Sequence, residues 1–364
     1  MTKRRFIALS TAVLTIVLVV QPGLLHDYAS AEKLPMRLTD QEFWKLSSEA
    51  SEPDGTFHSE NLVSNEIRFQ TIVPALVDAA VPGRAYLGVG SEQNFTYIAA
   101  TKPAIAIIVD IRRGNLDLHL IYKALFEMSA NRVDFVSRVF SREKPAGLTA
   151  ASTAAEIFTA FRRTTPSRAL YEQNLKEIKS ALQTKHAFPL FKGDLDGIDF
   201  VYRNWFEQGP DIRYQLNGGG GGNFPTYAEL MMGSDGAGRN RSYLSSEDTF
   251  RIVKDLQTRN MIVPIVGNFG GPKAIRTAAA WLKQKETIVS TFYTSNVEQY
   301  LRQDGIFGNF CASTSTLPLD AKSVFVRSAR AGFAGQPEVV GAGGNFNLEV
   351  KPMKPDLATC PAAR

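Results

Sequence analysis

The fold is decided by two neighbouring stretches, AYLGVGSEQN at residues 85–94 and AIAIIVD at residues 104–110. Each begins with an apolar run of strand length, and the first leads into a Gly-Val-Gly turn that opens a predicted helix. A continuous apolar run is typical of a strand buried on both faces, as in a parallel sheet. This strand–helix–strand order therefore predicts parallel strands joined by right-handed crossovers.

The alternation of strands and helices continues on both sides of this unit. Further strands are expected at residues 261–266, 287–293 and 323–328. Helices are expected at residues 66–80, 91–100, 115–129, 132–142, 153–163, 167–184, 274–285 and 296–302. Five glycines at residues 218–222 indicate a surface linker or, alternatively, a mobile lid. The expected fold is α/β, with a doubly wound, mostly parallel, Rossmann-like sheet and a helical insertion at about 130–260.

The remainder of the chain is expected to consist of a leader, an extension and a tail. Residues 1–31 form the leader, and residues 32–60 form a polar extension with one short helix around 41–50. The α/β domain is expected over residues 61–335. Residues 336–364 are rich in Gly, Pro and Lys and are expected to be irregular.

The leader has the pattern of a secretory signal peptide. Lys3-Arg4-Arg5 is followed by an apolar run at residues 6–20 and by the small residues Ala29-Ser30-Ala31. The run is shorter than the ~20 residues of a membrane-spanning helix. The protein is therefore expected to be exported, periplasmic or secreted. In the alternative, an uncleaved leader anchors the body to the outer face of the inner membrane, and this segment is the one expected membrane contact.

Charge and cysteine content exclude several classes of function. The net charge of +5 comes from 41 basic and 36 acidic residues, a balance that does not predict nucleic-acid binding. Two cysteines exclude a disulfide-dense scaffold, and after export Cys311 and Cys360 either form a bridge or stay as free thiols. Asp194, Asp196 and Asp199 resemble a calcium loop, but its twelfth position is Trp205, so no metal is expected. The oligomeric state is left open.

The glycine turn carries the main functional prediction. Asp110 ends the second strand 22 residues after Gly88, a spacing at which a carboxylate can accept hydrogen bonds from a ribose diol. Gly88 and Gly90 let the backbone approach the ligand closely, and Ser91 and Asn94 complete the predicted cofactor-binding set. The alternative is a tight turn with a capping aspartate and no ligand.

The third glycine of a dinucleotide motif is absent, since Gln93 occupies its position. Gln93 and Asn94 would crowd a pyrophosphate, which disfavours NAD and FAD. A nucleoside without phosphates, such as S-adenosylmethionine, fits better.

Five segments resemble an uncharacterised bacterial family with a class I S-adenosylmethionine-dependent methyltransferase-like fold. They are LGVGSEQNFTY at 87–97, VDIRR at 109–113, RSYL at 241–244, IVPIVGNFGGP at 262–272 and FYTSNVEQYL at 292–301. The resemblance covers about residues 60–330 and carries no activity over. Compared with methyltransferases proper, Asp110 matches the ribose-binding carboxylate. Tyr86 stands where those enzymes have an acidic residue, and Glu92 where they have the third glycine.

Two functions follow from these observations. An exported enzyme would lack S-adenosylmethionine, which is made in the cytosol, so a non-catalytic protein or one with an unidentified small-molecule ligand is favoured. The alternative is an S-adenosylmethionine-dependent methyltransferase acting on a small molecule or a protein. Asn268 and Tyr293, at the ends of later strands, are then its catalytic candidates.

Overall fold

The computed structural model describes residues 33–217, 224–330 and 346–363. The predicted signal peptide and the glycine run at 218–222 lie outside these residues. Within the described part of the chain, no helix combines the length and the apolar character that crossing a membrane requires.

In these residues six strands form one sheet in the order β3-β2-β1-β4-β5-β6. Their bounds are β1 Ala85–Gly88, β2 Ile105–Asp110, β3 Ile262–Val266, β4 Val289–Ser295, β5 Val324–Arg330 and β6 Phe346–Pro352. The first five strands are parallel, and β6 is antiparallel to β5. The predicted α/β architecture with a mostly parallel sheet is thus confirmed, and its strand order reverses between β1 and β4.

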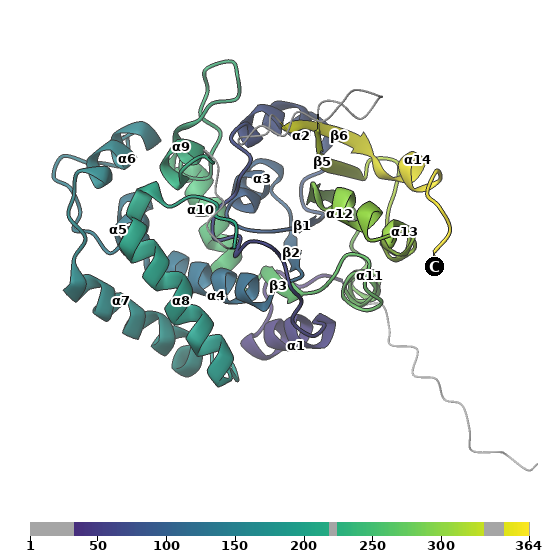
Figure 1. Cartoon of the computed structure of the whole chain (residues 1–364), viewed down its shortest axis with the longest axis horizontal. Helices are drawn as coiled ribbons and strands as arrows, with labels where there is room; N and C mark the ends of the chain where they lie inside the picture. The colour runs from purple at the N-terminus through teal and green to yellow at the C-terminus, as the bar shows by residue number, and fades with distance from the viewer. Residues whose placement is uncertain (1–32, 218–223, 331–345, 364) are drawn as a thin grey trace, which may run out of the picture. The chain divides into compact units, whose positions relative to one another are not determined.

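The central strands are buried on both faces, as their apolar sequences predict. Ile105 to Val109 of β2 are fully shielded from solvent, and β2 pairs with β1 through Leu87 and Ile107. One layer of helices contains α2, α3, α4 and α10, while α11 and α13 lie on the other side of the sheet (Figure 1). Their bounds are α2 Val73–Ala79, α3 Gln93–Thr101, α4 Arg113–Met128, α10 Glu247–Thr258, α11 Ala274–Gln284 and α13 Phe307–Thr314. The helix predicted at 66–80 is a 3₁₀ turn at Phe69–Ile72 followed by α2.

The middle of the chain adds further helices. These are α5 Arg132–Phe140, α6 Ala154–Arg162, α7 Arg168–Ser180, α8 Lys192–Gln208 and α9 Tyr227–Met232. Asp194, Asp196 and Asp199, which resembled a calcium loop, lie inside α8. The insertion shares the core of the sheet domain, because Phe135 of α5 packs on Phe126 of α4.

Both ends of the described chain pack on the sheet domain. At the N-terminal end, α1 (Asp40–Ala50) contacts β3 and α11. At the other end the structure differs from the irregular tail expected after residue 335, because β6 and α14 (Met353–Leu357) are regular elements. A disulfide joins Cys311 of α13 to Cys360, which resolves the pairing that the sequence left open.

Candidate functional site

The ends of β1, β2, β3 and β4 border one cleft. A cavity of about 400 Å³ lies there, lined by Val89, Asp110, Ile111, Phe269 and Leu301 among others. A smaller pocket adjoins it through Val89 and reaches Gly90, Ser91 and Tyr293. This is the place where ligands bind in open α/β sheets, outside the strand ends at the reversal of strand order.

The two glycines of the turn have different reasons to be glycine. Gly90 has a φ of +78°, which favours glycine, and a Cβ there would meet open space. At Gly88 a Cβ would collide with the side chains of Asn94 and Tyr86. Gly90 therefore serves the backbone turn beside the pocket, whereas Gly88 serves the packing beneath it.

Asn94 lies fully buried under the turn rather than in the cleft. Its amide group donates to the carbonyl oxygens of Val89 and Ser91, both at 2.8 Å. Its Oδ1 accepts from the Tyr86 hydroxyl at 2.8 Å. Tyr86, which stands where methyltransferases have an acidic residue, thus fixes Asn94, and Asn94 fixes the turn. Ser91 lines the smaller pocket. The sequence predicts Ser91 as the N-cap of this helix, but the N-cap is Glu92 and α3 begins at Gln93.

Asp110 lies at the end of β2 beside the glycine turn. Its Oδ1 accepts from the backbone N–H of Arg112 at 3.0 Å. Burial raises the pKa of Asp110 to about 6, against the opposing effects of Arg112, the Asn61 side chain and the Gly90 N–H, which hydrogen-bond the carboxylate. The side chain is 3% exposed and borders the larger cavity. The predicted pairing of the glycine turn with this carboxylate is therefore present in space.

A buried histidine of α4 hydrogen-bonds the glycine turn. His119 of α4 donates from Nε2 to the Gly90 carbonyl at 2.8 Å. Burial lowers the pKa of His119 to about 4, so the ring is neutral at physiological pH. Its Nδ1 has no hydrogen-bond partner among the described residues.

Tyr293 is tied to a buried carboxylate that the sequence did not single out. Glu66 accepts from Gln93 Nε2 at 2.6 Å, from Ser295 Oγ at 2.7 Å and from the Tyr293 hydroxyl at 3.1 Å. Burial, reinforced by the charge of Glu66, raises the pKa of Tyr293 well above its usual value. The Tyr293 ring borders the smaller pocket, while its hydroxyl is engaged within the protein.

Residues 51–65, which we call the strap, cross the ends of β3 and β2. The Glu52 N–H donates to the Val266 carbonyl, and the Gly55 N–H donates to the Ile111 carbonyl. The Glu52 carboxylate accepts from the backbone N–H groups of Asn268, Lys273 and Ala274 at 2.9–3.0 Å. Glu52 thus fills the anion site that the N-terminus of α11 would otherwise offer.

The strap fills the neighbouring helix terminus in the same way. Asp54 accepts from the N–H of Arg113, the first residue of α4, at 2.7 Å. Asn268 borders the larger cavity, but its Oδ1 accepts from the Gly270 N–H at 2.9 Å and stabilises the turn after β3. Carboxylates of the strap therefore already occupy N–H groups at the starts of both α11 and α4.

Aromatic residues form one wall of the cleft. Phe57 of the strap packs edge-on against Tyr300 of α12 (Val297–Gln303), with ring centroids 5.3 Å apart. His58 packs against both rings, and burial lowers its pKa. In the described part of the chain, no group of three His, Cys, Asp or Glu residues is arranged to hold a metal ion.

The structure brings most of the predicted site residues to this cleft. Gly90, Ser91, Asp110, Asn268 and Tyr293 border it, whereas Gly88 and Asn94 lie beneath the turn. The sequence missed the strap residues, because residues 51–65 have neither apolar periodicity nor a motif. One residue of the strap could have indicated a turn. Asn61 has a φ of +48°, a left-handed conformation that asparagine tolerates better than most residues.

Comparison with known proteins gives a family and no activity. A family model described as "Domain of unknown function (DUF7790)" matches residues 61–357 of the 364-residue chain. A search of curated proteins found no match.

Proposed function

The chain belongs to the family of the domain of unknown function DUF7790, and we propose that it is an exported protein that binds a nucleoside-type small molecule. The single observation that carries the proposal is the buried Asp110 carboxylate at the border of a cavity of about 400 Å³. Cavities of roughly 300–1,000 Å³ are usual for small ligands.

The chemistry of the cavity favours a molecule with a vicinal diol. The Asp110 carboxylate has two acceptor oxygens, and two adjacent hydroxyl groups can donate to both. The Asn61 amide, which hydrogen-bonds Asp110 in this structure, would give way to such a diol. Ile111, Phe269 and Leu301 supply apolar surface for a flat base. This combination fits a ribose joined to a nucleobase.

The strap favours a ligand without phosphates. Glu52 and Asp54 already accept the N–H groups at the starts of α11 and α4. A phosphate there would meet a carboxylate, and like charges repel. This disfavours a phosphate at these two helix starts, in line with the resemblance to methyltransferase-like proteins.

We propose a binding role rather than methyl transfer. The Asn268 amide and the Tyr293 hydroxyl, the catalytic candidates, both serve contacts within the protein. Purified protein is expected to transfer no methyl group from labelled S-adenosylmethionine to protein or small-molecule acceptors. Transfer that disappears in Asp110→Asn would establish the methyltransferase alternative.

The test is the thermal stability of the purified protein with adenosine, 2′-deoxyadenosine, S-adenosylmethionine and S-adenosylhomocysteine. A ligand at 100 times its Kd adds ~2.7 kcal/mol of stability. We expect ribonucleosides to raise Tm by a few degrees, 2′-deoxyadenosine to have a much smaller effect, and Asp110→Asn to remove the shift.

Asp304→Asn is the matched control, because Asp304 lines the same cavity. It is expected to keep most of the shift. Equal shifts with adenosine and 2′-deoxyadenosine, or no shift with any ribonucleoside at millimolar concentration, would overturn the proposal.

A further inference from the structure

A second cavity lies between α4, α8 and the strap. Its volume is about 330 Å³, and it shares no lining residue with the larger cavity of the cleft. Asp117 of α4, Phe191 and Phe200 at α8, and Asp54 of the strap are among its lining residues. The inference drawn from it does not depend on the function proposed for the cleft.

Asp117 is a buried carboxylate without a partner. The residue is 3% exposed, and its Oδ1 has no hydrogen-bond partner among the described residues. Its Oδ2 lies against Gly197 of α8, where a Cβ would collide with it. Gly197 thus makes room for a carboxylate that the protein itself does not satisfy. A donor from outside the protein would supply the hydrogen bond that this carboxylate lacks.

The cationic residues of this cavity are already paired. Arg113 forms two hydrogen bonds with Asp194, at 2.6 and 3.1 Å. Arg112 pairs with Glu60 and also donates to the Ser59 carbonyl. Neither arginine donates to Asp117, and the nearby carboxylates of Asp54 and Asp194 add to the negative field around it.

Two phenylalanine rings border the cavity in an exposed position. Phe191 is 54% exposed and Phe200 is 44% exposed, and in the described residues only three other large apolar side chains are comparably exposed. One contact of Phe191 is already of the cation–π type, since the Arg113 guanidinium lies 4.6 Å from its ring centroid. The exposed surface of both rings suits an aliphatic chain next to a cation.

We propose that this cavity binds a primary ammonium group on an unbranched aliphatic stem. The ammonium would donate to Asp117, and the stem would cover Phe191 and Phe200. An ammonium fits better than a metal ion, because no three metal-ligating side chains are suitably placed in the described part of the chain. This chemistry has two sources, a lysine side chain of a peptide and a free aliphatic amine.

Binding is expected to displace a proton. Burial, together with the charges of Asp194 and Asp54 and against that of Arg113, raises the pKa of Asp117 to about 8. At pH 7 the carboxyl group is therefore mostly protonated, and an ammonium that pairs with it favours the ionised form. Amine binding at pH 7 should release close to one proton per site.

The test is calorimetric titration of the purified protein with pentylamine, with pentan-1-ol as the uncharged probe of the same stem. We expect pentylamine to bind at least tenfold more tightly than pentan-1-ol. We also expect Asp117→Asn to weaken pentylamine at least tenfold and to abolish the proton release, which titrations in two buffers of different ionisation enthalpy detect. Asp196→Asn is the matched control, because Asp196 lines the same cavity but pairs with Lys192 at 2.6 Å.

A second series separates the two sources of the ammonium group. Tighter binding of Nα-acetyl-lysine-methylamide than of pentylamine assigns the site to a peptide side chain, and the reverse order assigns it to a free amine. Thermal unfolding confirms that each variant is folded. Equal binding of pentylamine and pentan-1-ol, an unchanged affinity in Asp117→Asn, or no binding of any amine at 20 mM would overturn the proposal.

Discussion

One carboxyl group beside the glycine turn, that of Glu92, is buried with few hydrogen-bond donors. Glu92 is fully buried, and its Oε1 accepts from the Ser64 N–H at 3.1 Å. Its Oε2 has no hydrogen-bond partner among the described residues. Burial raises the pKa of Glu92 to about 7. The ionised form is therefore disfavoured in the folded state, which makes Glu92 a source of instability at alkaline pH.

We expect Glu92→Gln to stabilise the protein at pH 8. Because the folded-state pKa lies above the unfolded value, the folded state binds more protons between the two, and the wild type loses stability as pH rises from about 4.5 to 7. The neutral amide avoids this loss, which the pKa difference places at up to about 3 kcal/mol. Urea unfolding at pH 8 and pH 4.5 measures the gain, which should vanish at the lower pH.

Glu172→Gln is the control, since Glu172 is exposed in a surface pair with Arg168. It should change the unfolding free energy by well under 1 kcal/mol at both pH values. A Glu92→Gln variant that is less stable than the wild type at pH 8 would show that the buried carboxylate is compensated.

The site residues that could be predicted from the sequence are those whose identity follows from the local backbone or from their position in one element. The positive φ of Gly90 favours glycine, and Asp110 stands out in the sequence as a carboxylate that ends a buried apolar strand. Asn94 could not be separated from the ligand-facing residues, because its partner Tyr86 became visible only when the strand and the helix were placed together. Glu66 lacked any signal, since its three side-chain partners come from two other segments.

Among the elements, the strap is the part of the site that could not be predicted from the sequence. Some elements were predicted close to their true bounds, as with α1 and β2. The amphipathic helix α10, which buries Phe250, Val253 and Leu256, was not predicted. The strap is held by backbone and carboxylate contacts to residues that are distant in the sequence. Asp54 accepts from Arg113, 59 positions away, and Glu52 accepts from Lys273, 221 positions away. No local pattern encodes such contacts. The helix α8 was missed for a different reason, because Gly193 and Gly197 lower its helix propensity.

We expect Glu52→Ala to loosen the strap. The change leaves the N–H groups of Asn268, after β3, and of Lys273 and Ala274, at the start of α11, without their carboxylate. This should lower the unfolding free energy by about 2 kcal/mol. Because the strap also carries Phe57 and Asn61 into the cleft, ribonucleoside affinity should fall as well. Chemical denaturation and ligand titration measure the two effects.

Glu49→Ala provides the comparison, since Glu49 is an exposed residue of α1 whose ion pair with Lys45 spans 4.0 Å. It is expected to change neither quantity appreciably. If Glu52→Ala and Glu49→Ala behave alike, the helix terminus of α11 is satisfied by water and the strap is held by other contacts.

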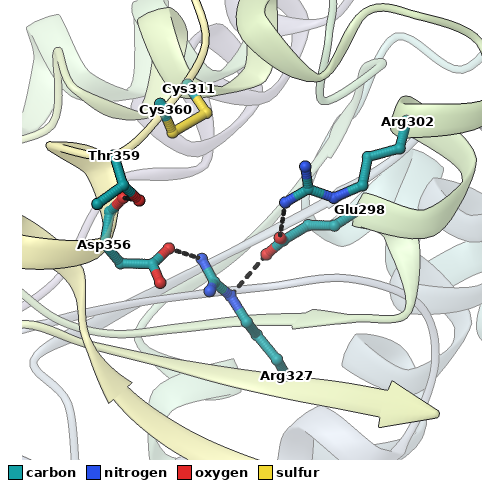
Figure 2. The surroundings of a disulfide bond; sticks show 7 residues. All are labelled: Glu298, Arg302, Cys311, Arg327, Asp356, Thr359 and Cys360. Carbon is teal, nitrogen blue, oxygen red and sulfur yellow. Dashed lines mark hydrogen bonds and ion pairs between the residues drawn. A yellow bond between two sulfur atoms is a disulfide. The ribbon is translucent and has the colours of Figure 1, made fainter. Parts of the chain in front are cut away.

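At the scale of the whole molecule, the C-terminal segment joins the last strands to the wall of the cleft. Figure 2 shows Arg327 of β5 between two carboxylates, 2.6 Å from Glu298 of α12 and 2.6 Å from Asp356 of α14. The same α12 carries Tyr300 and Leu301 to the cavity. The segment expected to be irregular thus covers the edge of β5 and supports one wall of the candidate site.

The disulfide between Cys311 and Cys360 closes this segment onto α13, as Figure 2 shows. The two cysteines are 49 positions apart, and a loop of that length corresponds to ~4 kcal/mol of stabilisation in the chain-entropy description. The double variant Cys311→Ser/Cys360→Ser is expected to lower the unfolding free energy by 2–4 kcal/mol, roughly, since real bridges often contribute less than this limit.

Reduction by dithiothreitol offers a second measurement of the same quantity in the unmodified protein, and it should lower Tm to the value of the double variant. The variant itself should be insensitive to the reductant. Since α12 is held by Arg327 as well as through α13, ribonucleoside binding should weaken without being lost. An unchanged stability after complete reduction would mean that β6, through its seven-residue pairing with β5, holds the tail in place by itself.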